Sequence, residues 1–177
     1  MSWENDLFAF LDDLEGRAEA LYDTEREAEL ADRSRAEYRQ VTLASRLMAS
    51  VGRELTLETA GVGPVTGRLE RVADGWCLVA GPAQDWVVLT DAVGAVHGAA
   101  DRSVPEVAWS PVARLGLGSA LRRLADSGER CVLRLRDGST REGALRRVGA
   151  DFVEVAGAGR VVLVAFAQLA AVQSRSG

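Results

Sequence analysis

The 177-residue chain contains no lysine, so all 21 of its basic residues are arginines. The absence of lysine excludes Schiff-base chemistry and the type of phosphate loop that requires a lysine. The single histidine, His97, ends a strand pattern with no acid next to it, so we expect a structural role for it. The two cysteines, Cys77 and Cys131, lack metal-ligand spacing and fall in apolar strand patterns, which predicts buried free thiols.

Long apolar runs and a basic amino-terminal region are also missing. No run of about 18 apolar residues is present to cross a bilayer. The opening MSWENDLFAF carries acids where a secretory signal would be basic. We therefore expect a cytoplasmic location and no membrane partner. The bias toward Ala, Gly, Val and Arg is typical of proteins encoded by GC-rich bacterial genomes, such as actinobacterial ones.

No catalytic constellation stands out. No two acids are spaced as an acid/base couple, and no nucleophile is flanked by a recognisable base. Of the two glycine pairs that look like phosphate loops, Gly61/Gly63 lies inside an expected hairpin and Gly116/Gly118 lacks a strand before it, so neither fits a nucleotide loop. These observations predict that the chain is not an enzyme and that it uses no cofactor and no metal.

What the chain does contain is an internal duplication. The pattern of residues 41–97 recurs 76 positions later without a gap. For example, the residue type is the same 76 positions after Gly52, Gly67, Leu69 and Val88. The matched positions are mostly apolar residues and glycines, which serve packing and turns. Two copies are too few for a solenoid, and each copy is long enough for a small barrel of its own.

Each copy predicts one short helix followed by five short strands. The helices are expected over 41–50 and 117–127, before Gly52 and Gly128, residues that tolerate a left-handed ending. Alternation of apolar residues with arginines over 130–136 is typical of a half-buried strand. Since no crossover helices separate the strands, we expect a mainly β fold with some α structure, built from two small barrels in tandem.

The first forty residues have a different pattern. Apolar residues spaced by three and four between acids predict an amphipathic helix from Trp3 to about Tyr22, followed by a charged helix or spacer. Its apolar stripe could cover the core of this chain or dock on a second subunit. The candidate association residues are Trp3, Leu7, Phe10, Leu11 and Leu14.

A segment with two prolines separates the copies. We expect Trp109 and Val107 to hold it against a barrel, and Ser110-Pro111 to cap the second helix. The predicted organisation is therefore an acidic arm, a first barrel, a linker and a second barrel, over residues 1–40, 41–98, 99–111 and 112–175.

The repeated pattern resembles the Sm-like family of small SH3-type barrels. In that family a DG turn leads to Gly-x-Leu, then to an apolar position and the third strand. Asp137-Gly138, Gly143, Leu145, Val148 and Phe152 match this order, and the first copy has Gly67, Leu69, Val72 and Trp76. The resemblance implies tandem Sm-like barrels over about 110 residues.

The RNA-contact residues of that family are not matched. Where the resemblance would require Asp and Asn, the second copy has Gly149 and Val153, and the first has Ala73 and Cys77. Thr90-Asp91 and Phe166-Ala167 stand in place of Arg-Gly. The family's RNA site therefore does not carry over to this chain.

Charge is divided unevenly along the chain. Residues 1–40 hold 12 acids and 5 arginines, whereas residues 111–177 hold 6 acids and 11 arginines. The acidic arm could pack against the basic copy in its own or a sister chain. Arg134, Arg136 and Arg141 could share one exposed face, because residues alternate along strands. The candidate anion or nucleic-acid contacts are Arg134, Arg136, Arg141, Arg146 and Arg147.

Two functions follow from these features. The favoured one is a non-catalytic interaction or assembly module that associates with itself or with another protein through the amino-terminal helix. The alternative is an RNA-binding or regulatory nucleic-acid-binding protein that uses the arginine-rich second copy. Nucleic-acid modules that bind single strands add exposed aromatics, whereas Phe152 and Phe166 are expected to be buried.

Overall fold

The computed structural model describes residues 3–174, with side chains at positions 14, 16, 17, 19, 21, 22 and 26–174. Across residues 3–174 it contains three α-helices and ten strands. The helices are α1 (Trp3–Tyr38), α2 (Leu43–Met48) and α3 (Leu117–Ser127). The strands are β1 (Glu54–Thr59), β2 (Gly63–Ala73), β3 (Trp76–Ala80), β4 (Asp85–Leu89), β5 (Val93–His97), β6 (Arg130–Leu135), β7 (Thr140–Val148), β8 (Phe152–Gly157), β9 (Arg160–Ala165) and β10 (Leu169–Ser174). The fold is therefore mainly β with some α structure.

Helix α1 belongs to one compact unit, which ends at Val41, and the two repeats belong to a second, which begins at Thr42. The helix of the first repeat is shorter than its expected range. Thr42 caps it, because the Thr42 hydroxyl accepts from the Ser45 amide and the Ser45 hydroxyl accepts from the Thr42 amide, each at 3.1 Å. Helix α3 has its expected bounds and ends at Gly128, whose φ of 69° is left-handed.

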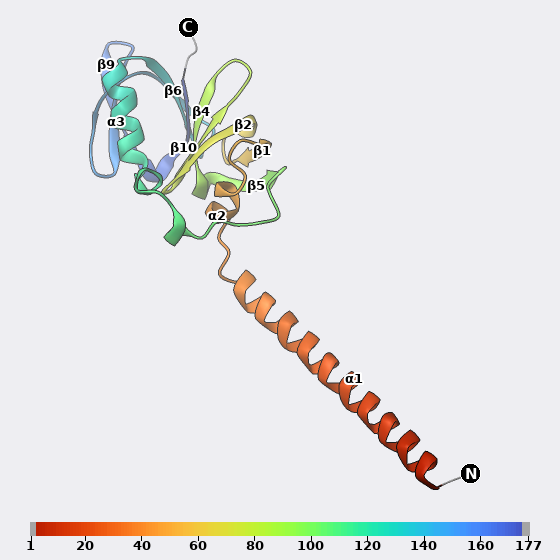
Figure 1. Cartoon of the computed structure of the whole chain (residues 1–177). Coiled ribbons are helices and arrows are strands. Elements are labelled where there is room, and N and C mark those ends of the chain that lie inside the picture. Colours follow the sequence, from red (N-terminus) through yellow and green to blue (C-terminus); the bar gives the residue numbers. More distant parts are fainter. Residues whose placement is uncertain (1–2, 175–177) are drawn as a thin grey trace. The chain divides into compact units, whose positions relative to one another are not determined.

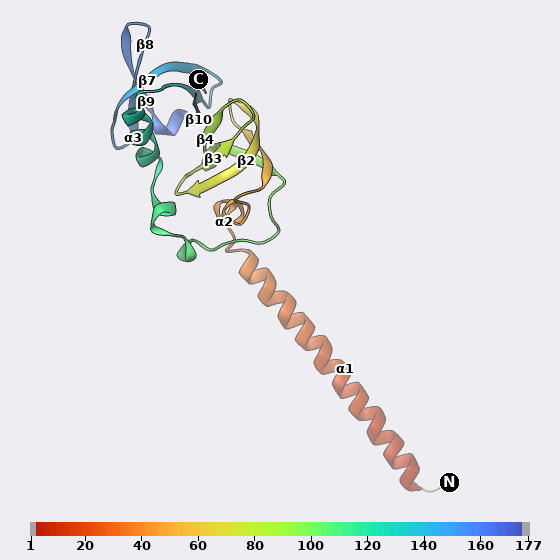
Figure 2. The same ribbon diagram turned by 45° about the horizontal axis from the view of Figure 1, so that its top comes forward.

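All ten strands form one antiparallel sheet, in the order β5-β1-β2-β3-β4-β10-β6-β7-β8-β9. The first repeat supplies the first five strands of that order and the second repeat supplies the other five in an equivalent order. The two halves meet where β4 pairs with β10, with Val88 opposite Ala171 and Val87 opposite Val172. Figures 1 and 2 show β10 beside β4. We call the β4·β10 contact, together with the side chains that surround it, the repeat junction.

The two repeats share their apolar cores. One cluster is centred on the second repeat, yet Trp76, Val87 and Leu89 of the first repeat are part of it. The other is centred on the first repeat and includes Ala171 of the second. Because each cluster contains side chains from both repeats, residues 42–174 are expected to unfold as one cooperative body.

Both cysteines lie in these cores. Cys77 belongs to the cluster of the first repeat and Cys131 to that of the second; each has no exposed surface, and both are free thiols. The prediction of buried free thiols is confirmed.

The glycine in the second strand of each repeat has a steric role. A Cβ on Gly67 would lie 2.2 Å from the Ala80 carbonyl oxygen, and a Cβ on Gly143 would lie 2.3 Å from that of Ala156. A glycine inside a strand often marks a bend or a bulge. The register shifts come later, after Leu69 in β2 and after Leu145 in β7, so the glycine itself permits close approach of the next strand.

The segment between the repeats departs from expectation in two places. Trp109 is buried in the apolar cluster centred on the first repeat, as predicted, and its indole N–H donates to the Val104 carbonyl of the same segment at 3.0 Å. Val107 is 86% exposed, so the prediction that it holds the segment down is wrong. Ser110 caps the 3-10 turn Pro111–Arg114, whereas α3 begins only at Leu117 with Gly116 as its N-cap. The prediction that Ser110-Pro111 caps α3 is therefore also wrong.

Candidate functional site

Arg134 lies at the repeat junction and is held there by a side-chain amide. Its Nε and Nη2 donate to Oε1 of Gln173 on β10, at 3.3 and 3.1 Å. The Gln173 amide nitrogen in turn donates to Oε1 of Gln84, immediately before β4. These three side chains therefore tie β6, β10 and the first repeat together.

Arg136 makes a second polar contact across the repeats. Its Nη2 lies 2.5 Å from Oδ1 of Asp91, and its Nη1 donates to the Asp91 carbonyl oxygen at 3.2 Å. The Arg136 side chain is only 27% exposed. Arg134 and Arg136 are both half-buried, so the expectation that they share one exposed face with Arg141 is wrong for these two.

The remaining candidate arginines are exposed on β7. Arg147 forms a two-pronged pair with Glu154 on β8, at 3.0 and 2.9 Å. The hydrogen bonds to Glu154, together with its negative charge, raise the pKa of the Arg147 guanidinium. Arg141 donates to the Thr140 carbonyl at 2.7 Å, and Arg146 is exposed. The five arginines are therefore divided between junction contacts, an ion pair and open surface.

The candidate association residues belong to α1. Leu14 is 43% exposed, and further along the same helix Leu21 and Leu30 are 65% and 57% exposed. The other four candidates lie outside the side chains that the structure describes: Trp3, Leu7, Phe10 and Leu11. Helix α1 therefore presents at least three exposed leucines in the single chain.

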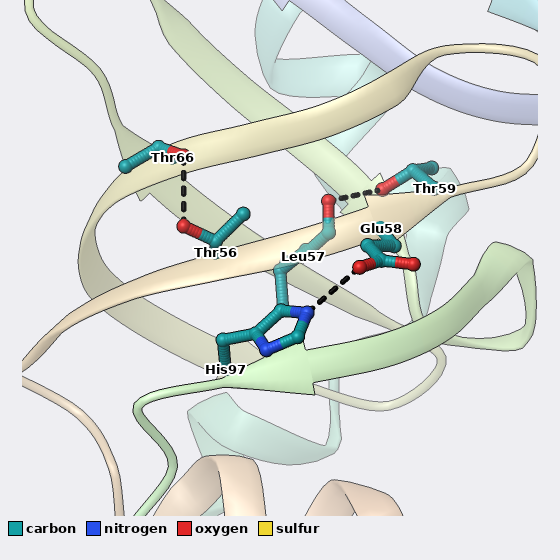
Figure 3. A network of polar contacts seen from close by, with 6 residues as sticks. All are labelled: Thr56, Leu57, Glu58, Thr59, Thr66 and His97. Atoms are coloured by element: carbon teal, nitrogen blue, oxygen red, sulfur yellow. Dashed lines mark hydrogen bonds and ion pairs between the residues drawn. The ribbon is translucent and has the colours of Figure 1, made fainter.

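His97 has an acidic partner that its sequence neighbours do not show. Nε2 of His97 on β5 lies 2.7 Å from Oε1 of Glu58 on the neighbouring strand β1 (Figure 3). The hydroxyls of Thr56 and Thr66 are 2.8 Å apart in the same region. His97 and Glu58 are both exposed, so they form a polar pair at the outer part of the sheet.

Sequence reasoning singled out Arg134, Arg136 and His97 but not the residues they contact, although the duplication contains a signal for two of these contacts. Positions 76 apart place Glu58 of the first repeat at Arg134 of the second, and His97 at Gln173. The two pairs thus occupy equivalent places in the sheet and differ in chemistry. A comparison of where the copies disagree, rather than where they agree, would have drawn attention to them.

The described residues offer little reactive chemistry. Among them, no three His, Cys, Asp or Glu side chains are grouped so that they could hold a metal ion. Burial raises the pKa of the Cys77 thiol to about 12, and burial together with Glu129 raises that of Cys131, so both thiols stay protonated near neutral pH. In the part of the chain with assigned structure, no helix has the length and apolar character needed to cross a membrane.

Two clefts lie near ends of the sheet. One, of about 570 Å³, is lined by Glu58, Thr59, Ala60 and Val93 beside β5. The other, of about 470 Å³, is lined by Arg141, Glu142 and Arg160 among others in the second repeat. The charged lining of the second cleft consists of two arginines and one glutamate.

Comparison with known proteins adds no further assignment. The sequence matches no protein-family model. It also matches no curated protein.

Proposed function

We propose that this chain is a non-catalytic assembly module, in which a second copy associates through α1 and the body consists of two Sm-like barrels in tandem. The barrel assignment is supported by the strand order, which is equivalent in the two repeats, and by the bulge in each second strand. Fold alone does not define function, so the argument for assembly depends on surfaces.

The exposed leucines of α1 carry the proposal. Leu14 and Leu21 are seven residues apart, and Leu7 continues the same spacing in the sequence. Apolar residues repeated every seven positions form the seam by which two helices pack together. Burying such leucines against a second helix removes from water the apolar surface that a single chain exposes.

The arginine contacts favour assembly over nucleic-acid binding. Arg134 and Arg136 are used within the repeat junction, and Arg147 is paired with Glu154. An arginine held by a neighbouring side chain has fewer of its five N–H donors free to bind a phosphate. Arg141 and Arg146 alone make a smaller basic surface than the sequence suggested.

Replacing Leu14 with aspartate is expected to weaken self-association. Each buried leucine contributes roughly 1.5 kcal/mol or more, and each helix pair would lose two, so the association constant falls about a hundredfold. Sedimentation of the full chain over a concentration series measures this change.

Leu30→Asp is the matched control, since it makes the same replacement in the same helix. Leu30 lies 16 positions from Leu14, which places it on roughly the opposite side of an ideal helix. It is exposed as well, and both variants have the same cost in helix propensity. Equal weakening by the two variants, or no weakening by either, would contradict association through the Leu14 face.

A further inference from the structure

The two repeats differ at one position of their fourth strand that faces the core. Trp86 in β4 pairs with Val79, and the equivalent residue of β9, Val162, pairs with Val155 in the same register. In the first repeat the half-buried Trp86 packs against the apolar cluster of that repeat. Because valine is much smaller than tryptophan, the second repeat has less side-chain volume at the same place in the sheet.

The indole of Trp86 lies over a glycine that has a counterpart in the second repeat. A Cβ built on Gly81 would lie 3.5 Å from the indole nitrogen of Trp86. Shifted by 76 positions, Gly81 corresponds to Gly157, which lines the 470 Å³ cleft of the second repeat together with Val155 and Val162. The cleft therefore lies where the indole ring lies in the first repeat.

Two arginines line this cleft at positions where the first repeat has uncharged residues. Arg141 on β7 corresponds to Val65, which is only 2% exposed in the core of the first repeat. Arg160 on β9 corresponds to Gln84. Both arginines are exposed. The second repeat thus lacks the tryptophan at this place and carries two positive charges beside the cleft.

The single acid of the lining has a basic partner. Oε1 of Glu142 lies 3.6 Å from Nη2 of Arg130, which offsets its charge. Nη1 of Arg141 donates to the Thr140 carbonyl at 2.7 Å, which uses one of the five N–H donors of that guanidinium and leaves others for a ligand. The charged side chains that line the cleft therefore carry a net positive charge.

We propose that this cleft binds a small aromatic carboxylate. The aromatic ring takes the place of the indole, over Gly157, and the carboxylate accepts hydrogen bonds from Arg141 and Arg160. A planar guanidinium donates two parallel N–H bonds to a carboxylate and forms a strong charge-assisted pair with it. The volume of 470 Å³ is within the range of about 300–1,000 Å³ that is usual for small-molecule sites. The inference requires neither self-association nor α1.

Indole-3-propionate is the probe, because it carries an indole ring and one carboxylate. Calorimetric titration of the full chain is expected to show one site per chain. Indole-3-propionamide keeps the ring without the charge, and propionate keeps the charge without the ring, so each is expected to bind at least about tenfold more weakly. No binding of indole-3-propionate, or equal affinity for either of the other two compounds, would overturn the proposal.

A peptide tests the source of the carboxylate. Gly-Gly-Trp ends in an indole side chain beside a free carboxylate, as the last residue of a protein chain could. We expect it to bind no more tightly than indole-3-propionate. Tighter binding of the peptide would show that the cleft prefers the end of a protein chain and would overturn the assignment to a small molecule.

Replacing Val162 with tryptophan tests the location of the site. This variant restores the first-repeat residue and fills the cleft, so it is expected to abolish binding of indole-3-propionate. The first repeat accommodates Trp86 at the equivalent place, so the variant is expected to fold, which circular dichroism checks. A folded Val162→Trp chain that binds the probe as before would overturn the proposal.

Two further variants leave the cleft open and alter only its charge. Arg141→Val and Arg160→Gln also introduce the first-repeat residues, and each is expected to weaken binding at least about tenfold. Arg146→Gln is the matched control, since Arg146 is an exposed arginine of β7 that does not line the cleft. It is expected to leave the affinity unchanged. Equal weakening by Arg146→Gln and Arg160→Gln would place the carboxylate on the general positive surface and overturn the site.

Discussion

Replacing Gly143 with alanine is expected to destabilise the body of residues 42–174 by about 3 kcal/mol. The added Cβ would lie 2.3 Å from the Ala156 carbonyl oxygen and 2.8 Å from its carbonyl carbon. These atoms are backbone, so relief requires β7 and β8 to separate and their hydrogen-bonded register to change. Chemical denaturation followed by circular dichroism measures the loss.

Gly116→Ala provides the control for this glycine substitution. No heavy atom lies within 4 Å of a Cβ built on Gly116, and its φ of −70° suits any residue. We expect a change smaller than about 1 kcal/mol, the usual scale for an N-cap residue. Because Gly67 occupies the equivalent place in the first repeat, Gly67→Ala should behave like Gly143→Ala. An alanine at position 143 that leaves stability unchanged would contradict the close approach of β7 and β8.

Truncating Leu133 to alanine is expected to destabilise both repeats together. Leu133 is fully buried in the second repeat, and loss of a buried leucine costs about 2–5 kcal/mol through lost burial and the cavity that remains. All four tryptophans precede the second repeat in the sequence, and one of them, Trp76, packs in the cluster that contains Leu133, so fluorescence follows the first repeat and the cluster it shares. The shared clusters predict that the fluorescence transition shifts with the circular dichroism transition.

Independent repeats would give a different result. The fluorescence transition would stay at its original denaturant concentration while a second, earlier transition appeared in circular dichroism. Leu163→Ala is a useful comparison, because Leu163 is a leucine of the same repeat that lies on an exposed edge. At concentrations where the chain is single, its truncation should cost far less than that of Leu133.

Much of the local structure could be predicted from the sequence. Alternation of apolar and polar residues is set by the pleat of a strand, so the strands of both copies could be placed, and the left-handed glycine at position 128 marks the end of α3. The buried state of Cys77 and Cys131 followed from the same patterns. These features depend on neighbours in the chain, which the sequence displays directly.

The candidate site was harder to predict, because its contacts join distant residues. Arg136 meets Asp91 from the other repeat, and His97 meets Glu58 from a strand that precedes it by 39 positions. Residue type and local spacing do not reveal which strands become neighbours. The sheet order leaves Arg134 and Arg136 half-buried near the contact between the repeats, whereas Arg160 on the end strand β9 and Glu58 on β1 stay exposed.

The repeat junction is the feature on which this account of the molecule depends, and nuclear Overhauser contacts test it most directly. We expect backbone contacts between Val88 and Ala171 and between Val87 and Val172, with slow hydrogen exchange of the amides that pair β4 with β10. They should persist in the Val162→Trp chain, since that substitution lies on the end strand β9. If β4 and β10 instead lack contacts with each other and their amides exchange rapidly, the repeats do not share a sheet and the central claim is wrong.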